Sequence, residues 1–282
     1  MANNMDDQDI FGTDGLAVRG SGTWAEDKLY YLGRYLKILS VGMKNKWRGR
    51  LYYVDLFAGP GRCLIRGETQ KEIDGSPLIA LLGFDFAKYF FFEMDRTCFE
   101  ALGARARKRA PDIWGKVKMI LGDCNDTIEQ AELPSEGLGL AFIDPTGISQ
   151  LSFETIKKLT AGRQIDLIIN FPEGMGIRMN LHQYTQTDAN ALDRFMGSAR
   201  WKDRYHEQPL KSFDHMCAEI AKEYLANLGS LGYLAVDSDW VPVKTDQNTL
   251  LYYLLFASKH PRGNDLWRKI KRIGPHGQRE LF

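Results

Sequence analysis

The sequence predicts an α/β protein with a mostly parallel sheet covered by helices on both faces. Short apolar segments alternate five times with stretches of helical periodicity between Leu51 and Phe171. The last of these segments, Ile165–Phe171, is apolar at nearly every position, so both faces of that strand should be buried. Strand–helix alternation with strands of this kind is typical of a parallel sheet between two helical layers.

The elements follow in a regular order. Residues 1–22 lack apolar periodicity, so we expect a mobile N-terminal arm. From Trp24, apolar residues at helical spacing predict an amphipathic helix that runs to about Gly42. The expected strand–helix pairs are Leu51–Phe57 with Ser76–Leu82, Tyr89–Phe92 with Arg96–Arg109, Val117–Leu121 with Asn125–Glu132, Leu138–Ile143 with Phe153–Thr160, and the strand Ile165–Phe171.

The alternation stops after Pro172 for about 40 residues. We interpret residues 173–210, approximately, as an insertion into a single domain that spans residues 23–282. A helix is expected over Phe213–Leu228, and two β-rich segments, Tyr233–Val243 and Leu250–Ser258, should complete the sheet.

Composition excludes several classes of protein. The 282 residues are 44% hydrophobic and carry 37 basic against 36 acidic side chains, which argues against disorder and against a global field that attracts nucleic acid. No uncharged apolar run approaches the roughly 20 residues that cross a bilayer, and the acidic N-terminus is unlike a secretory signal. We therefore expect a soluble, cytoplasmic chain without a membrane partner.

The four cysteines and five histidines are dispersed along the chain. No CxxC pair and no HxxxH spacing offers the ligands of a zinc site or an iron–sulfur cluster. The sequence thus predicts no metal site and no disulfide framework.

The sharpest motif follows the first strand, where Asp55-Leu56-Phe57-Ala58-Gly59-Pro60-Gly61 joins a buried strand to a loop with two glycines. Glycines let the backbone approach a ligand where a side chain would collide. The spacing is neither a G-x-G-x-x-G fingerprint nor a Walker loop. A plain Gly-Pro-Gly turn is the structural alternative.

Three further strands end in polar residues. Glu93 follows an aromatic strand and could accept both ribose hydroxyls of a nucleoside, whereas Asp95 suits the N-cap of the next helix. Gly122 and Asp123 follow the third strand, where the carboxylate could accept from an adenine amino group or simply cap a helix. Asp144 and Pro145 follow the fourth strand. Because parallel strands end at one edge, these residues predict a crevice for an adenine nucleoside.

These motifs resemble those of S-adenosylmethionine-dependent methyltransferases with a Rossmann-like class I fold. The loop from Asp55 to Gly61 resembles motif I, while Glu93, Asp123 and Asp144–Gly147 fall at motifs II to IV. More narrowly, "YVDLFAGPGRC", "GSPLIAL", "GDCND", "LAFIDPTG", "DLIINFPEGM" and "LLYYLLFASKHP" resemble the three-Cys-motif partner protein family, TcmP, over about residues 24 to 262. The resemblance implies a seven-stranded sheet closed by a C-terminal antiparallel hairpin.

The resemblance also implies S-adenosylmethionine as the cofactor, and a radical-SAM-like partner protein with a three-cysteine motif. Asp144 would be catalytic, accepting a proton or hydrogen bond from the nucleophile, with a buried structural Asp as the alternative. The implied cofactor-binding residues are Asp55, Phe57, Ala58, Gly59, Gly61, Glu93, Asp123, Cys124, Asp144 and Pro145.

The acceptor side is expected next to the fourth and fifth strands. Enzymes that methylate amines usually carry Asp/Asn-Pro-Pro-aromatic at motif IV, but Asp144 is followed here by Pro-Thr-Gly. Phe171 and Pro172 could supply the missing apolar wall. The predicted acceptor-side residues are Thr146, Asn170, Phe171, Arg178 and Arg200.

The insertion mixes basic and aromatic side chains. Such a mixture can contact phosphates and stack on bases, although packing aromatics would look the same. The residues concerned are Arg178, Arg194, Arg200, Lys202 and Arg204 with Tyr184, Phe195, Trp201 and Tyr205.

The leading hypothesis is a methyltransferase that acts on nucleic acid or a nucleotide-derived substrate. A non-catalytic subunit that keeps the nucleoside pocket and positions its three-cysteine partner is the alternative, and the altered motif IV favours it. An NAD-type oxidoreductase is disfavoured because the glycine fingerprint is wrong.

Overall fold

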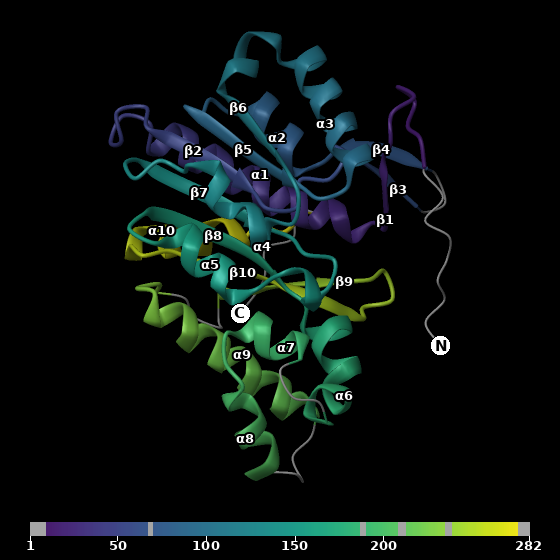
Figure 1. Cartoon of the computed structure of the whole chain (residues 1–282), viewed down its shortest axis with the longest axis vertical. Coiled ribbons are helices and arrows are strands. Elements are labelled where there is room, and N and C mark those ends of the chain that lie inside the picture. The colour runs from purple at the N-terminus through teal and green to yellow at the C-terminus, as the bar shows by residue number, and fades with distance from the viewer. Residues whose placement is uncertain (1–9, 67–69, 187–189, 208–212, 235–238, 276–282) are drawn as a thin grey trace.

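The fold centres on one seven-stranded sheet (Figure 1). The computed structural model describes residues 10–66, 70–186, 190–207, 213–234 and 239–275. The strands of the large sheet are β2 (Leu51–Asp55), β5 (Lys88–Glu93), β6 (Val117–Leu121), β7 (Leu138–Ile143), β8 (Gln164–Phe171), β9 (Val241–Lys244) and β10 (Leu250–Ala257). Their order is β6-β5-β2-β7-β8-β10-β9.

The first five strands in that order are parallel, and the last two are not. β10 runs antiparallel to β8, with Leu254 opposite Asn170, and β9 runs antiparallel to β10. The prediction of a mostly parallel seven-stranded sheet with a C-terminal antiparallel hairpin is confirmed. This is the sheet that the resemblance to Rossmann-like class I methyltransferases implied.

Helices cover both faces of the sheet. One core lies under α1, α2, α3 and α10, and the other under α4, α5, α7 and α9. The helices are α1 (Trp24–Gly42), α2 (Ser76–Gly83), α3 (Arg96–Arg109), α4 (Cys124–Thr127), α5 (Phe153–Thr160), α6 (Leu181–Gln186), α7 (Ala191–Met196), α8 (Arg200–Glu207), α9 (Phe213–Ser230) and α10 (Pro261–Lys271).

Local sequence explains several helix starts. Gly75 precedes Ser76 and Pro77, which places the proline in the first turn of α2 where its missing N–H is harmless. Asp95 caps α3 by accepting from the backbone N–H of Cys98 at 2.7 Å, as the sequence predicts. The helix expected over Asn125–Glu132 is shorter, because α4 gives way to a 3₁₀ turn, η2 (Ile128–Ala131).

A second, three-stranded sheet was not predicted. The segment after Gly61 forms the antiparallel pair β3 (Arg62–Ile65) and β4 (Lys71–Asp74), and β1 (Arg19–Ser21) pairs parallel with β3. The expected mobile arm is therefore corrected from Ile10 onward, because these residues belong to the folded body; residues 1–9 lie outside the described residues.

Arg105 fixes the N-terminal segment to the body of the protein. Its side chain is 2% exposed and donates to both oxygens of Asp14, to the carbonyls of Leu16 and Ala17, and to the carbonyl of Pro60. The hydrogen bond from Arg105 is the main reason that the pKa of Asp14 is lowered to about 2. One guanidinium thus joins the N-terminal segment to the glycine loop.

The C-terminal third differs from expectation at two places. Of the strand expected over Tyr233–Val243, only β9 is present among the described residues, and positions 235–238 lie outside them. The insertion contains α6, α7 and α8, which lie with α9 beyond β8 and β10 (Figure 1). Within the described ranges, no helix has the length and apolar character that crossing a bilayer requires.

We predict that Arg105→Met lowers the free energy of unfolding by roughly 3 kcal/mol, because it leaves Asp14 and three carbonyls without their cation. Chemical denaturation at constant pH measures the effect. Lys108→Met is the matched control, since Lys108 is exposed on the same helix. A loss no larger than that of the control would contradict the role assigned to Arg105.

Candidate active site

A cavity of about 220 Å³ opens at the carboxyl ends of β2, β5 and β6. It lies where the strand order reverses, between β5 and β7 on either side of β2, which is where open α/β sheets bind ligands. Four of the predicted cofactor residues line it. The lining consists of Arg19, Leu56, Phe57, Glu93, Met94, Gly122, Asp123, Cys124, Ser149 and Gln150.

Asp55 does not line this cavity, although the sequence predicts it as a cofactor ligand. Its side chain is fully buried and accepts from the Tyr53 hydroxyl at 3.0 Å and from the Phe57 backbone N–H at 3.2 Å. Burial is the largest influence and raises the pKa of Asp55 to about 7, although hydrogen bonds from Ser76, Tyr53 and Phe57 oppose it. Asp55 therefore supports the glycine loop through its hydrogen bond with Phe57 N, outside the cavity.

The two glycines of the loop have different environments. Both have positive φ, +62° at Gly59 and +84° at Gly61. A Cβ at Gly59 would meet nothing within 4 Å, whereas one at Gly61 would lie 2.9 Å from Leu102. Gly59 thus leaves open space, while Gly61 is required for packing against α3. Ala58 is buried, and its backbone N–H donates to Phe92 O at 2.9 Å.

Glu93 joins the end of β5 to the glycine loop. One carboxylate oxygen accepts from Gly59 N at 2.7 Å, and the other accepts from Asp95 N at 2.8 Å. The side chain is 6% exposed and lines the cavity. Because each carboxylate oxygen can accept two hydrogen bonds, Glu93 retains capacity for a ligand's hydroxyls.

Asp123 combines the two roles that the sequence left open. One of its oxygens caps α4 by accepting from Asn125 N at 2.8 Å and from the Asn125 amide at 2.7 Å. The residue also lines the cavity, next to buried Cys124. Burial, reinforced by the charge of Asp123, raises the pKa of Cys124 to about 12, so its thiol stays protonated.

Asp144 is held by two side chains from other elements. Lys28 of α1 donates to Asp144 Oδ2 at 2.5 Å, and the Asn170 amide donates to Oδ1 at 2.9 Å and to Pro145 O at 3.4 Å. Burial is the largest single influence on the pKa of the Lys28 ammonium and lowers it, but the charge and hydrogen bond of Asp144, together with Tyr252 and Cys63, raise that pKa by more. The structure thus brings Asp144, Pro145 and Asn170 together, as predicted.

The remaining acceptor-side residues are dispersed. Thr146 donates through its backbone N–H and its hydroxyl to Gln150, which lines the cavity. Phe171 is fully buried and packs on Phe195, Tyr224 and Trp240. The expectation that Phe171 walls the acceptor is therefore wrong, because alternate residues of a strand point to opposite faces and Asn170 takes the crevice side.

The basic and aromatic residues of the insertion also separate. Arg178 pairs with Glu173 and Asp214, and Arg200 begins α8 beside a surface hollow that does not include Asp144. Phe195 and Trp201 belong to the core, at 0% and 1% exposure. For these two rings the packing interpretation is correct, because a buried ring cannot stack on a base.

Two charged residues at the site were missed from sequence. Arg19 lines the cavity from β1, and it was hidden within the expected mobile arm. Lys28 interrupts the apolar stripe of α1, one turn before Leu32, and a cation in such a stripe is a signal that it has a buried partner. Among the described residues, no cluster of three or more His, Cys, Asp or Glu could hold a metal ion.

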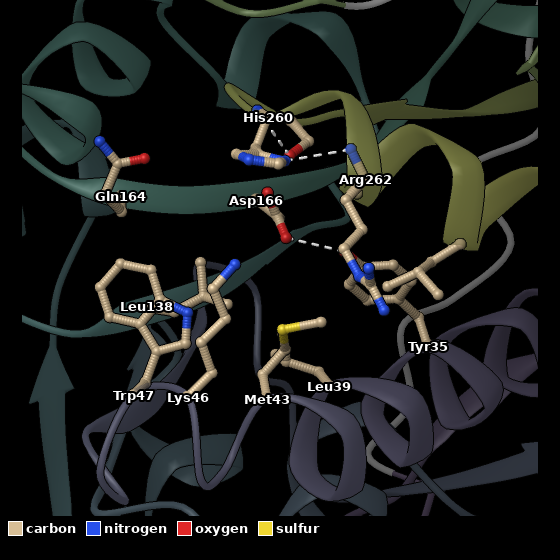
Figure 2. A pocket seen from close by; sticks show the side chains of 13 residues that line it. Tyr35, Leu39, Met43, Lys46, Trp47, Leu138, Gln164, Asp166, His260 and Arg262 are labelled. Carbon is tan, nitrogen blue, oxygen red and sulfur yellow. Dashed lines mark hydrogen bonds between the residues drawn. The ribbon is translucent and has the colours of Figure 1, made fainter.

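A different cavity, of about 70 Å³, lies towards the amino ends of β7 and β8 (Figure 2). At its centre, Asp166 accepts from the Tyr35 hydroxyl at 2.7 Å, and His260 and Arg262 of the α10 end lie beside it. The volume suits a few waters. None of the predicted site residues lines this cavity, so we assign the candidate site to the carboxyl edge.

No protein-family model and no curated protein sequence matches this chain. Among solved structures, protein LPL1258 from Legionella pneumophila is similar with a TM-score of 0.50 at 11% identity, over 92% of this chain and 94% of that one. Cofactor-bound Rv0187 from MTB is similar with a TM-score of 0.44 at 11% identity, over 81% of this chain and 79% of that one. Geranyl diphosphate methyltransferase in complex with SAM is similar with a TM-score of 0.43 at 11% identity, over 83% of this chain and 85% of that one. At these identities the likeness concerns the fold alone.

Asp166 supplies a prediction about pH. Burial is the main cause that raises its pKa from 3.8 to about 6, against hydrogen bonds from Ser258 and Tyr35 that lower it. The folded state therefore binds the proton more tightly than the unfolded state. The stability that the protonated Asp166 contributes to the folded state is fully present below about pH 4, and it is lost as pH rises through about 6.

We expect Asp166→Asn to become more stable relative to the parent as pH rises from 4 to 8, by up to roughly 3 kcal/mol. An amide cannot ionise, and both partners are hydroxyls that can donate or accept. Denaturation at several pH values measures the difference, with exposed Asp112→Asn as the control. A difference that does not change with pH would show that Asp166 ionises normally.

Proposed function

We propose that this chain is an S-adenosylmethionine-dependent methyltransferase that acts on nucleic acid or a nucleotide-derived substrate. The observation that carries the proposal is the row of acids and glycines at the carboxyl ends of adjacent parallel strands around one cavity at the switch point. A partner with a three-cysteine motif is part of the proposal, and the resemblance to the TcmP family supports that part.

The residues around the cavity fit the cofactor. The open space at Gly59 allows a ligand to pass close to the backbone, and Glu93 can accept from ribose hydroxyls. In the proposed complex Asp123 accepts from the adenine amino group, and Met94 and Cys124, which line the same cavity, are apolar neighbours of the ring. Arg19 offers a cation for the carboxylate of the methionine part.

The cofactor supplies a methyl group on a sulfonium, and the protein has to align the nucleophile with it. Asp144 can accept a hydrogen bond or a proton from the nucleophile. Lys28 neutralises its charge and fixes its direction, while Asn170 holds the other oxygen. The side-chain N–H2 of Asn170 donates to two oxygen atoms, which fixes the orientation of the amide. Its Oδ1 is buried without a hydrogen-bond partner among the described residues, so it is available to an N–H or O–H group of the methyl-accepting substrate.

A non-catalytic subunit that binds the nucleoside is the second candidate. Motif IV lacks the aromatic residue that usually follows Asp/Asn-Pro-Pro, and Phe171 is buried between helices and strands and does not replace it; both observations favour this candidate. The pairing of Asp144 with Lys28 is compatible with this role, because a purely structural ion pair needs no acceptor.

We expect the parent chain to bind S-adenosylhomocysteine and S-adenosylmethionine, but not NAD, in calorimetric titrations. Glu93→Ala should weaken S-adenosylhomocysteine binding by roughly 1–3 kcal/mol, because ribose hydroxyls and the N–H of Gly59 lose their acceptor. Glu93→Gln keeps one acceptor oxygen and should lose less. Exposed Glu100→Ala is the control. Unchanged binding by Glu93→Ala would refute the ribose assignment.

Asp144→Ala and Lys28→Met should both keep S-adenosylhomocysteine affinity and lose methyl transfer, since both residues act on the nucleophile's side. Labelled S-adenosylmethionine, incubated with fractionated nucleic acid, nucleotide and protein pools, measures transfer. If Asp144→Ala instead loses cofactor binding, the residue is a cofactor ligand. If the parent binds cofactor but labels no pool with or without its partner, the non-catalytic candidate is favoured.

A further inference from the structure

A larger cavity, of about 600 Å³, lies beyond β8 where the insertion begins. Glu173 and Arg178 of the insertion, Cys217 of α9, Trp240 before β9 and Tyr253 of β10 line it. Its volume falls within the roughly 300–1,000 Å³ that small-molecule sites occupy. It shares no lining residue with the cofactor cavity, and Glu173 follows Asn170 by three positions.

Two residues that line this cavity each carry a polar atom of opposite kind that is buried without a partner among the described residues. The two atoms are Oε2 of Glu173, whose residue is 5% exposed, and Nε1 of Trp240, whose residue is 9% exposed. The other oxygen of Glu173 accepts from Arg178 at 2.7 Å. An indole N–H can only donate and a carboxylate can only accept, so the pair calls for a ligand with an acceptor and a donor on one molecule. Buried polar groups are rarely left unpaired.

Aromatic rings form part of the wall. The ring centroids of Trp240 and Tyr253 are 5.5 Å apart, and those of Phe171 and Trp240 are 5.1 Å apart. The packing of Phe171 against Trp240 fixes the indole. Charges around the cavity balance, because Arg178 and Lys222 accompany Glu173 and Asp214. A simple anion therefore gains little here, whereas a flat ligand gains contact with the rings.

The nearby thiol does not supply a nucleophile. Burial, followed by the charge of Glu173, raises the pKa of Cys217 to about 12, so the thiol stays protonated near neutral pH. Cys217 therefore lines the cavity as a neutral thiol.

We propose that this cavity binds a nucleobase, a flat nitrogen heterocycle whose edge sets an N–H donor beside a ring nitrogen or carbonyl acceptor. The acceptor on the base would pair with Trp240 and the donor with Glu173. Assigning this base to the methyl acceptor rests on the proposed function, because the cavity flanks the strand end that carries Asn170. Base binding itself does not depend on methyl transfer.

Titrations of the full chain with AMP, CMP, GMP, UMP and ribose 5-phosphate test the proposal. We expect at least one of the four nucleotides to bind and ribose 5-phosphate not to bind. Trp240→Phe keeps a ring but removes the N–H, and Glu173→Gln keeps the shape but removes the charge; each should weaken that nucleotide at least tenfold. Trp114→Phe and Glu100→Gln, both distant from the cavity, are the matched controls and should change nothing.

S-adenosylhomocysteine affinity should be the same in all these variants, which also shows that they fold. A single-stranded RNA oligonucleotide that binds more tightly than the mononucleotide, with salt dependence, identifies nucleic acid as the source of the base; equal affinity identifies a free nucleotide. Binding of none of the nucleotides, or equal binding by Trp240→Phe and the parent, overturns the proposal. If the parent binds nucleotide but no S-adenosylhomocysteine, the proposed function fails while the base site stands.

Discussion

The loops that follow β2 and β7 must diverge, because the chain turns to opposite faces of the sheet after these two neighbouring strands. After β2 it crosses to α2 on the α1 side, and after β7 it crosses to α5 on the other side. The divergence leaves the sheet edge open between them. The cofactor cavity, the glycine loop and Asp144 all lie at this opening, and the chemistry proposed for the chain depends on it.

Hydrogen bonds within the chain shape this opening without any ligand. Glu93 draws the loop of Gly59 against the end of β5, and Arg105 holds the N-terminal segment on the carbonyl of Pro60. The two carboxylates at this opening, Asp55 and Asp144, have different environments. Asp144 contributes to the raised pKa of Asp55, and Lys28 places a compensating cation at Asp144. Asp55 thus supports the loop, while the carboxylate that faces the crevice is the one with a cation beside it.

The sequence was sufficient for the type of sheet, with its closing antiparallel hairpin, and for four of the ten residues that line the cavity, because these depend on short contiguous patterns. Buried strands followed by Glu93 or Asp123 are short, contiguous signals, and parallel strands place their ends at one edge. It was insufficient where a side chain's partner is distant in the chain. Lys28 and Asp144 are 116 residues apart, and Arg105 and Asp14 are 91 apart. Phe171 failed for a different reason, since a strand apolar on both faces gives no alternation from which to tell which side chain meets the crevice.

A crystal structure of the chain with S-adenosylhomocysteine bound would show at which edge of the sheet the cofactor lies. We predict the ribose hydroxyls on Glu93, the adenine between Met94 and Cys124 with its amino group on Asp123, and the sulfur turned towards Asp144. A complex with the ligand in the cavity around Asp166, or with its ribose away from Glu93, would contradict the claim that the carboxyl edge at the switch point is the cofactor site.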